Sequence, residues 1–362
     1  MLSSISLQNF RNYKKSSFEF DSKSIVIIGP NTAGKSNLIE SVYLLSAGKS
    51  FRAEKDAQMV KIGNEMGRVR ARLQTPERSD GGQGKVEDTD LEVVVTVGEV
   101  AGVRTQFKRY FVNGVAKRQS DFVGNLPAVL FSPQDLEIVA GSPGGRRNFL
   151  DNVLEQTDRD YRIALLGFTK ALRQRNALLE LVKDTGRRIE KQLEYWDSLV
   201  IRNGSVLTRK REEFIKYLNK SKKDVFEFVI EYDMSIISKE RLEQYRDAES
   251  ASGITLVGPH RDELFIYFEK DRQLRSFGSR GQQRLGVLQL KLLELQYIKE
   301  KLNVSPLLLL DDIFSELDED HIKLILGTLG NSQTIITTTH EEFIPAKIKS
   351  KMGVIELNAH SA

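Results

Sequence analysis

The stretch that decides the fold is Gly29-Pro30-Asn31-Thr32-Ala33-Gly34-Lys35-Ser36. It follows the apolar run Ile25–Ile28, which is typical of a buried strand, and it precedes a segment from Asn37 to Leu45 with the apolar spacing of a helix. The stretch fits the pattern G-x-x-x-x-G-K-[ST], whose backbone N–H groups wrap phosphates while the following helix adds the positive end of its dipole. A strand, this loop and a helix in immediate succession predict a nucleotide-binding α/β domain.

We expect this loop to bind ATP together with Mg²⁺. The Lys35 side chain is suited to reach the β- and γ-phosphates, and the Ser36 hydroxyl is suited to bind Mg²⁺. The glycines permit close approach of the backbone to the phosphates, so all eight residues from Gly29 to Ser36 are predicted to bind the cofactor.

A second stretch, Leu307-Leu-Leu-Leu310-Asp311-Asp312, predicts the metal site. Four apolar residues that end in a carboxylate are typical of a buried strand that presents Asp311 at its tip, where a carboxylate holds Mg²⁺ in nucleotide-hydrolysing enzymes. Asp312 is then placed to polarise an attacking water. An apolar strand ending in Asp is common by itself, but the combination with loop 29–36 predicts Asp311 as a metal ligand and Asp312 as a catalytic carboxylate.

A third stretch, Phe277-Gly-Ser279-Arg-Gly281-Gln282-Gln283, opens a helix expected from about Gln282 to Lys299. A serine and a glycine at a helix N-terminus make an anion site for the same reason as the phosphate loop. The plainer alternative is a helix N-cap without a ligand. The residues alone leave both interpretations open.

Composition limits the classes of function. The chain has 362 residues, the length of about two domains, and no cysteine, which excludes disulfides, thiolate nucleophiles and Cys-ligated metal sites. The first residues lack the apolar core of a signal peptide, and no run of about 18 apolar residues is present that could cross a bilayer. We therefore expect a soluble, cytoplasmic protein that has no membrane partner.

The positive charge is concentrated in one helical region. The whole chain has 54 Lys+Arg against 50 Asp+Glu, an excess of 4. Residues 161–225 alone contain 16 Lys or Arg and 8 Asp or Glu, an excess of 8, within long helical patterns. A surface that binds nucleic acid and a pair of solvated helix faces both fit this charge.

The three stretches occur in the order typical of an ABC-type ATPase, and two further segments extend the resemblance. Ser315-Glu-Leu317-Asp318 resembles the D-loop, and His340, at the end of a strand-like run, stands where ABC enzymes have a switch histidine. The resemblance predicts an α/β fold, an ABC-ATPase head similar to SMC heads with an inserted, mainly helical lobe. Residues 1–131 and 300–362 are expected to form the ATPase lobe, and residues 132–299 the helical lobe that carries the signature.

The chain also resembles the RecF family of DNA-repair ATPases from residue 9 to about residue 340. The matching segments include Asn9-Phe-Arg11-Asn-Tyr13, Phe131-Ser-Pro-Gln134-Asp135-Leu136, Gln174-Arg175-Asn176 and Gly258-Pro-His260-Arg261-Asp262. The resemblance implies an ATP-dependent homodimer that binds double-stranded DNA near junctions with single-stranded gaps. It also implies that the protein acts with RecR and RecO in loading RecA.

The resemblance assigns further residues to the nucleotide. Ser279, with Gly281 and Gln282, would contact the γ-phosphate held by the other subunit, so that two chains enclose two nucleotides. Gln134 would serve as the Q-loop residue, although its place after a proline differs from the usual pattern. Arg11 would contact the nucleotide or, alternatively, pair with an acidic side chain at the surface.

The catalytic set implied by the resemblance is Lys35, Ser279, Asp312 and His340, acting in a weak, DNA-stimulated ATPase. Many ABC enzymes have Glu where this chain has Asp312, which is one methylene shorter, so slow hydrolysis is expected. Two alternatives remain open. One is the nucleotide-binding subunit of a membrane transporter, and the other is a clamp in which ATP gates dimerisation without catalysis.

Two pairs of charged residues have several interpretations. Arg146 and Arg147 lie in the first turn of a helix that begins near Ser142. They could face DNA, a partner subunit or solvent. Arg261 and Asp262 are interpreted as a structural ion pair after a Gly-Pro turn.

Overall fold

The computed structural model describes residues 1–74, 88–186, 190–313, 327, 332–339, 342 and 352–358. The chain divides into two compact units. Unit 1 consists of Met1–Pro133 and Tyr297–Ala362, and unit 2, Gln134–Gln296, is inserted between these two segments in the sequence. The expected division of the chain into domains at residues 132 and 299 stays a prediction, because a compact unit is not by itself a domain that folds alone.

Unit 1 contains a six-stranded antiparallel sheet in the order β2-β1-β4-β5-β8-β9. Its strands are β1 (Leu2–Phe10), β2 (Tyr13–Glu19), β4 (Met66–Leu73), β5 (Thr89–Thr96), β8 (Lys108–Val112) and β9 (Val115–Lys117). Side chains alternate between the two faces, so that Val69 and Ala71 are buried whereas Arg70 is exposed. The sequence has Asn113-Gly114 between two apolar runs, which predicts a hairpin, and this two-residue turn does join β8 to β9 with both residues at positive φ.

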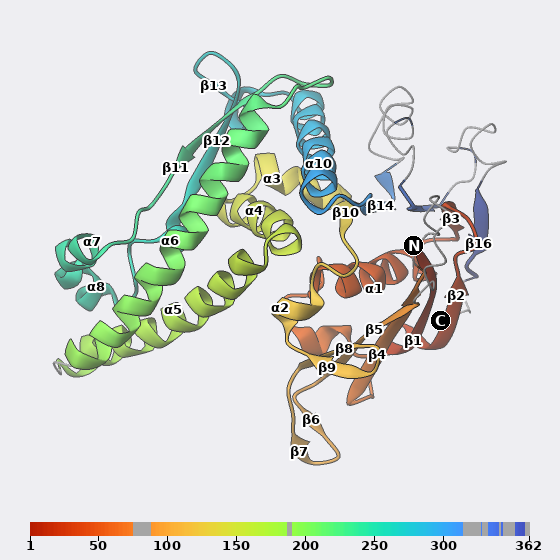
Figure 1. Ribbon diagram of the computed structural model, residues 1–362, viewed down its shortest axis with the longest axis horizontal. Coiled ribbons are helices and arrows are strands. Elements are labelled where there is room, and N and C mark those ends of the chain that lie inside the picture. Colours follow the sequence, from red (N-terminus) through yellow and green to blue (C-terminus); the bar gives the residue numbers. More distant parts are fainter. Residues whose placement is uncertain are drawn as a thin grey trace, which may run out of the picture. The chain divides into compact units, whose positions relative to one another are not determined.

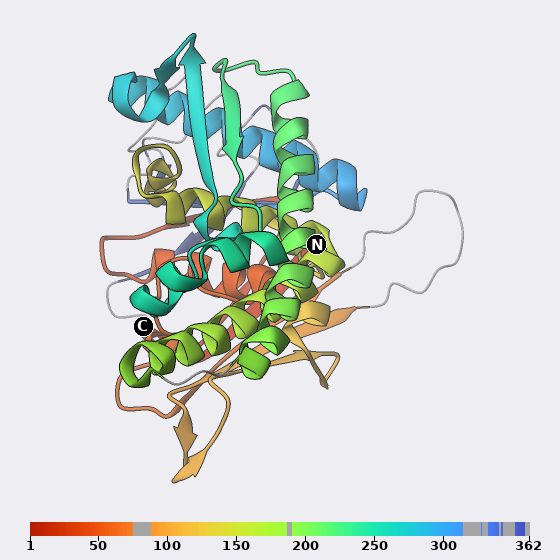
Figure 2. The ribbon, with the colours of Figure 1, turned by 90° about the vertical axis from the view of Figure 1, so that its left-hand side faces the viewer.

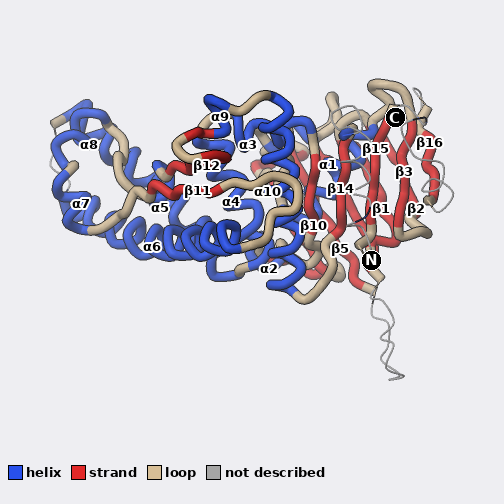
Figure 3. The backbone as a smooth tube through the Cα atoms, turned by 90° about the horizontal axis from the view of Figure 1, so that it is seen from above, coloured by secondary structure: helices blue, strands red, loops and turns tan. Residues whose placement is uncertain are grey.

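The second sheet of unit 1 is parallel and has the order β10-β14-β15-β3-β16, which Figure 3 shows from left to right. Its strands are β10 (Ala128–Phe131), β14 (Leu307–Asp311), β15 (Thr334–Thr338), β3 (Ser24–Ile28) and β16 (Gly353–Glu356). Parallel strands bring their carboxyl ends to one edge of the sheet. The loop after β3 and the carboxylates at the end of β14 therefore meet at the same edge.

Helix α1 (Lys35–Ala47) lies between the two sheets of unit 1 and contacts strands of both (Figure 1). Apolar residues on all sides of it are fully buried, as expected for a helix covered on both sides. They include Leu38, Ile39, Val42, Leu44 and Leu45. The remaining short elements of unit 1 are η1 (Asp56–Met59), β6 (Glu99–Val100), β7 (Val103–Arg104) and α2 (Gln119–Phe122).

Unit 2 is mainly helical and carries a three-stranded antiparallel sheet in the order β11-β12-β13. Its longest helices, α5 (Arg159–Thr185) and α6 (Glu190–Lys220), lie side by side (Figures 1 and 2). The other elements are η2 (Pro133–Asp135), α3 (Leu136–Ala140), α4 (Pro143–Thr157), β11 (Val229–Asp233), α7 (Lys239–Gln244), α8 (Arg246–Ser252), η3 (Pro259–Arg261), β12 (Glu263–Glu269), β13 (Arg272–Gln273), α9 (Leu274–Phe277) and α10 (Arg280–Leu302), whose last turns belong to unit 1.

Some expectations about single elements need comment. Residues 225–232 have the apolar alternation of a strand, but β11 begins only at Val229, and the Val225 N–H donates to the Gln289 side chain at 2.8 Å. The polar, glycine-rich segment 76–90, which predicts a surface loop, and the segment 320–329, which predicts a helix, lie largely outside the described residues. Within the described ranges, no helix combines the length and the apolar character needed to cross a membrane.

Candidate nucleotide-binding site

The phosphate loop connects β3 to α1, and its shape depends on Gly34. Gly34 precedes the first residue of α1 with φ 97°, a conformation that favours glycine. A Cβ atom at this position would lie 2.7 Å from the Tyr13 hydroxyl oxygen, so no larger residue fits without displacement. The Tyr13 hydroxyl in turn donates to the Gly34 carbonyl at 3.0 Å. Tyr13, the first residue of β2, thus stabilises the conformation of the phosphate loop.

Lys35 is buried and folds back onto its own loop. Its Nζ donates to the carbonyl oxygens of Gly29 and Pro30, at 2.7 and 2.9 Å. Burial lowers the pKa of Lys35, and the nearby carboxylates of Asp312 and Asp311 partly oppose this effect. The ammonium group is therefore held at the loop, close to the positions that phosphates occupy in loops of this pattern.

Ser36 and Asp311 meet although 275 residues separate them in the sequence. The Ser36 hydroxyl donates to Asp311 Oδ1 at 2.9 Å, and Asp311, the last residue of β14, is almost fully buried. The same Oδ1 accepts a second hydrogen bond, at 2.8 Å, from the hydroxyl of Thr337 on the neighbouring strand β15. The carboxylate predicted to bind metal is thereby fixed from two sides.

Asp312 follows the strand in a left-handed conformation with φ 52°. Its N–H donates to Thr337 Oγ1 at 3.0 Å, so one threonine hydroxyl orients both acidic residues. A non-glycine residue at positive φ costs about 1 kcal/mol or more, and such positions cluster at functional sites. The conformation turns the chain sharply at the tip of β14.

These residues line one hollow on the surface of unit 1. Its lining brings together three parts of the sequence, namely Asn31, Thr32, Gly34, Lys35, Ser36, Asn37, Arg52 and Asp312. Asp311 lies just beneath it through its bond to Ser36. Six of the lining residues were singled out in the sequence for binding or catalysis, and the fold does bring them together.

Arg11 is held in an ion-pair cluster centred on Glu40 of α1. Glu40 is completely buried and accepts hydrogen bonds from Arg11 (2.8 and 2.6 Å), Arg52 (2.9 Å) and Ser50. Burial by itself would raise the pKa of Glu40, but the bonds from Arg11, Ser50 and Arg52 outweigh it and lower the pKa. Arg11 therefore does pair with an acidic side chain, but this partner is buried and not at the surface as expected. Its contact with nucleotide stays a prediction.

The signature residues belong to unit 2 and form the start of α10. The Gln282 N–H donates to Ser279 Oγ at 3.3 Å, and the Ser279 N–H donates to Gln282 Oε1 at 2.8 Å, which is a reciprocal capping arrangement. Ser279 and Gly281 are exposed, and Gln282 is half-buried. Ser279 is therefore an N-cap residue, and the role of these residues toward a nucleotide stays a prediction.

Two further predicted residues can be placed only in part. Gln134 lies in the short helix η2 at the start of unit 2 and is exposed. His340 and the segment Ser315–Asp318 lie outside the described residues. Their predicted roles are untested.

The interpretation of Arg261 and Asp262 as an ion pair is wrong. The Asp262 carboxylate is fully buried and accepts hydrogen bonds from Arg211 (2.8 Å) and from the Ser235 N–H (2.9 Å). Arg261 instead donates to the Thr255 carbonyl at 3.0 Å. The pairing is non-local because Arg211, in the C-terminal half of α6, points into the interior of unit 2, where a buried charge requires an acidic partner.

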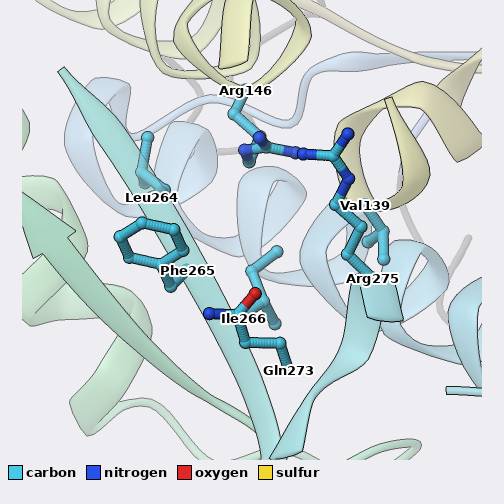
Figure 4. A pocket seen from close by; sticks show the side chains of 7 residues that line it. All are labelled: Val139, Arg146, Leu264, Phe265, Ile266, Gln273 and Arg275. Atoms are coloured by element: carbon cyan, nitrogen blue, oxygen red, sulfur yellow. The ribbon is translucent and has the colours of Figure 1, made fainter. Parts of the chain in front are cut away.

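Arg146 and Arg147 are also structural within unit 2. Arg146 is buried, and its guanidinium donates to Glu263 at 2.7 and 3.1 Å, while Arg147 donates to the Asp262 carbonyl at 2.8 Å. Solvation of the Arg146 side chain is therefore excluded, whereas the Arg147 side chain is half-buried. A cavity of about 30 Å³ lies beside Arg146 and Arg275 (Figure 4), with room for about one water and none for a nucleotide.

The hollow of unit 1 fits ATP with Mg²⁺. Magnesium prefers oxygen ligands and keeps several waters in addition to one or two protein groups and the substrate phosphates. The Ser36 hydroxyl and the Asp311 carboxylate provide two such oxygens 2.9 Å apart, and Lys35 provides a cation at the same place. The residues present therefore suit both the nucleotide and the metal.

Three residues of this site escaped the sequence analysis as site residues. The sequence around Thr337 predicts only a strand. The feature that could have pointed to its role is a hydroxyl group within a fully buried strand. Glu40 lies in the helix α1, which has mainly apolar residues, and Arg52 follows this helix. Only the fold shows that the two charged side chains meet.

Comparison with known proteins identifies the family. Residues 1–361 match the family described as RecF/RecN/SMC N terminal domain. The DNA replication and repair protein RecF of Moorella thermoacetica is 35% identical over 98% of this chain and 94% of its own length, and that of a Cyanothece species is 36% identical over 98% and 96%. Solved structures described as the recombination mediator protein RecF in the RecFOR pathway, with ATPrS and with ATP, each superpose with a TM-score of 0.83 at 31% identity. They cover 95% of this chain and 94% and 93% of theirs.

These similarities extend over nearly the whole chain and confirm the predicted fold class, an α/β head with an inserted, mainly helical part. The chain belongs to the RecF family of DNA replication and repair proteins, whose head domain is of the SMC type.

Proposed function

We propose that this protein is an ATP-dependent DNA-binding protein of recombinational repair that hydrolyses ATP slowly. The observation that carries the proposal is the meeting of Ser36, Asp311 and Lys35 at one hollow, since this set suits a nucleotide with its metal. The RecF relatives named for DNA replication and repair, and the RecF structure described with ATP, support the same function.

In this proposal, loop 29–36 binds the phosphates of ATP, and Ser36 with Asp311 holds Mg²⁺. The metal, when bound, neutralises charge on the phosphates during transfer to water. Lys35 stabilises the same charge from the loop side. Asp312 orients and polarises the attacking water, with its backbone conformation fixed by Thr337.

Two copies of the chain enclose two nucleotides in the proposed assembly. Ser279 and Gly281 are exposed at the N-terminus of α10, where a helix has the positive end of its dipole and free N–H groups. Such a surface is suited to the γ-phosphate of a nucleotide bound by another subunit. His340 would complete each site.

The proposed substrate is duplex DNA beside a single-stranded gap, and the proposed partners are RecR and RecO, which then act on RecA. The support comes from the RecF structures described as part of the RecFOR pathway. The transporter alternative is not favoured, because relatives named for DNA repair match nearly the full length of the chain.

Light scattering coupled to size exclusion tests this function with ATP, Mg²⁺ and gapped DNA. The wild type should form a dimer on DNA only with ATP, Lys35→Arg and Ser279→Arg should remain monomeric, and Asp312→Asn should form a dimer that persists. A wild type that is monomeric in every condition would overturn the proposal. If the Asp312→Asn dimer dissociates as fast as the wild-type dimer, ATP hydrolysis is not the step that releases it, and the protein is a clamp that ATP gates without catalysis.

A further inference from the structure

Long parts of helices α5 and α6 in unit 2 are nearly free of acidic residues. Residues 161–179 of α5 contain no Asp or Glu, and residues 195–211 of α6 contain only Asp197. The same two segments contain eight Lys or Arg side chains, which are Arg162, Lys170, Arg173, Arg175, Arg202, Arg209, Lys210 and Arg211. The charge alone does not tell which of these cations are available to a ligand.

The structure shows that three of these cations are neutralised within unit 2. Arg175 is buried and pairs with Asp197 and Glu249, at 2.6 and 2.7 Å. Arg211 is buried and pairs with Asp151 and Asp262, and Lys210 pairs with Asp158 at 2.7 Å. The buried pairs of Arg175 and Arg211 stabilise the fold, and breaking them would leave uncompensated buried charges. Lys210 is partly exposed but is already paired.

Of the remaining five cations, Arg162 is half-buried and donates to the carbonyl oxygens of Glu155 and Gln156. The other four are exposed and have no hydrogen bond or ion pair to any described residue. They are Lys170 and Arg173 on α5, and Arg202 and Arg209 on α6. Arg202 and Arg209 are seven residues apart, about two helical turns or 10.5 Å, so they lie on one face of α6. Lys170 and Arg173 are three residues apart and share one face of α5.

The face of α5 with Lys170 and Arg173 and the face of α6 with Arg202 and Arg209 both point away from the interior of unit 2. A Cβ atom at Gly204 of α6 would lie 3.3 Å from both the Phe168 ring of α5 and Pro259, so these buried positions face a common core. The exposed cations are offset by about half a turn from the buried positions of their own helices. The four form a surface that we call the outer basic face, defined as Lys170, Arg173, Arg202 and Arg209.

We propose that the outer basic face binds the phosphate backbone of duplex DNA. Four cations that pair with no described residue, on two helix segments without exposed acids, complement the negative charge of the duplex. Long flexible side chains suit phosphates, which carry no sequence information. The inference rests on the proposed DNA-binding function and deepens it by naming the residues that make contact. An acidic protein surface is the competing ligand.

The test compares two double variants that remove the same net charge. Arg202→Ala with Arg209→Ala removes two unpaired cations, whereas Lys216→Ala with Lys222→Ala removes two exposed cations that pair with Glu212 and Asp224. Fluorescence anisotropy of a labelled gapped duplex, with ATP and Mg²⁺, measures affinity across a salt series. The first variant should bind about tenfold more weakly, and the slope of log K against log salt should fall by about 2. The control should stay within about twofold of the wild type.

Each outcome decides the inference. If both double variants bind DNA as the wild type does, the outer basic face does not contact DNA and the proposal is wrong. If both weaken equally, only overall charge matters and the assigned residues are wrong. A wild type that binds no DNA with ATP would instead refute the proposed function. Lys170→Ala and Arg173→Ala, added to the first variant, should weaken binding further, and ATP binding and the thermal unfolding midpoint should not change.

Discussion

Thr337 and Asp311 are linked by a hydrogen bond of 2.8 Å between their side chains, from the Thr337 hydroxyl to Asp311 Oδ1. Both residues are buried on adjacent parallel strands, and the same hydroxyl accepts the N–H of Asp312. The position of both acidic residues at the nucleotide site therefore depends on a residue that is not expected to touch nucleotide or metal itself.

Replacing Thr337 by Val should raise the Mg²⁺ concentration needed for half-maximal ATPase activity by about tenfold or more, because partners of metal ligands typically contribute this much to metal affinity. The shape of the side chain is kept, but the hydrogen bond to Asp311 is lost. Mg²⁺ titrations of steady-state hydrolysis measure the change. Thr337→Ser, which keeps the hydroxyl, should behave nearly as the wild type. Thr334→Val, on the same strand, should have little effect on the Mg²⁺ requirement, and an equal effect would contradict the role of Thr337.

Replacing Glu40 by Gln should destabilise unit 1 by about 3 kcal/mol, since it leaves Arg11 and Arg52 without their shared buried counter-charge. Urea unfolding of the wild type and the variant measures the difference. Because Arg52 lines the nucleotide hollow, ATP affinity should also fall. In a double-mutant cycle, Glu40→Gln should reduce ATP affinity far less when Arg52 is already Ala. Independent, additive effects would show that Glu40 does not act through Arg52.

The stability of unit 2 should decrease as the pH falls from about 6.5 toward 4 because of His260. Burial lowers the pKa of His260 to about 4, while a hydrogen bond with the Thr255 carbonyl opposes the shift and the charge of Arg261 adds to it. The unfolded state then binds more protons than the folded state between these pH values, so the stabilisation is complete above about pH 6.5 and is lost below it.

Urea unfolding at pH 7 and pH 5 should therefore show a loss of about 2 kcal/mol that depends on this side chain. The variant His260→Leu should lack this part of the loss. If the two proteins lose equal stability between the two pH values, His260 is not buried in its neutral form.

Replacing Arg211 by Leu should destabilise unit 2 by about 3–5 kcal/mol, because Asp262 would remain buried without its partner. Arg211 also donates to the Pro259 carbonyl at 2.7 Å and pairs with Asp151, so several elements lose a shared contact. Chemical denaturation followed by circular dichroism gives the value. Arg209→Leu, two residues away and exposed, serves as the control and should change stability by less than about 0.5 kcal/mol.

The sequence by itself determined the features that depend on local geometry. Loop 29–36 is recognisable because phosphate binding requires glycines, a lysine and a hydroxyl at fixed spacing within a few residues. The strand that ends in Asp311 and the hairpin turn at Asn113-Gly114 are recognisable for the same reason, since their chemistry lies within one short segment.

Only the tertiary structure decided which distant side chains meet. Nothing in the local pattern pairs Glu40 with both Arg11 and Arg52, or places the Thr337 hydroxyl on Asp311, because these contacts depend on how sheets and helices pack. The same holds for charge. The excess of positive charge in residues 161–225 is visible in the sequence. Which of these cations are neutralised and which remain exposed depends on burial and ion pairing, and the packing of the helices determines both.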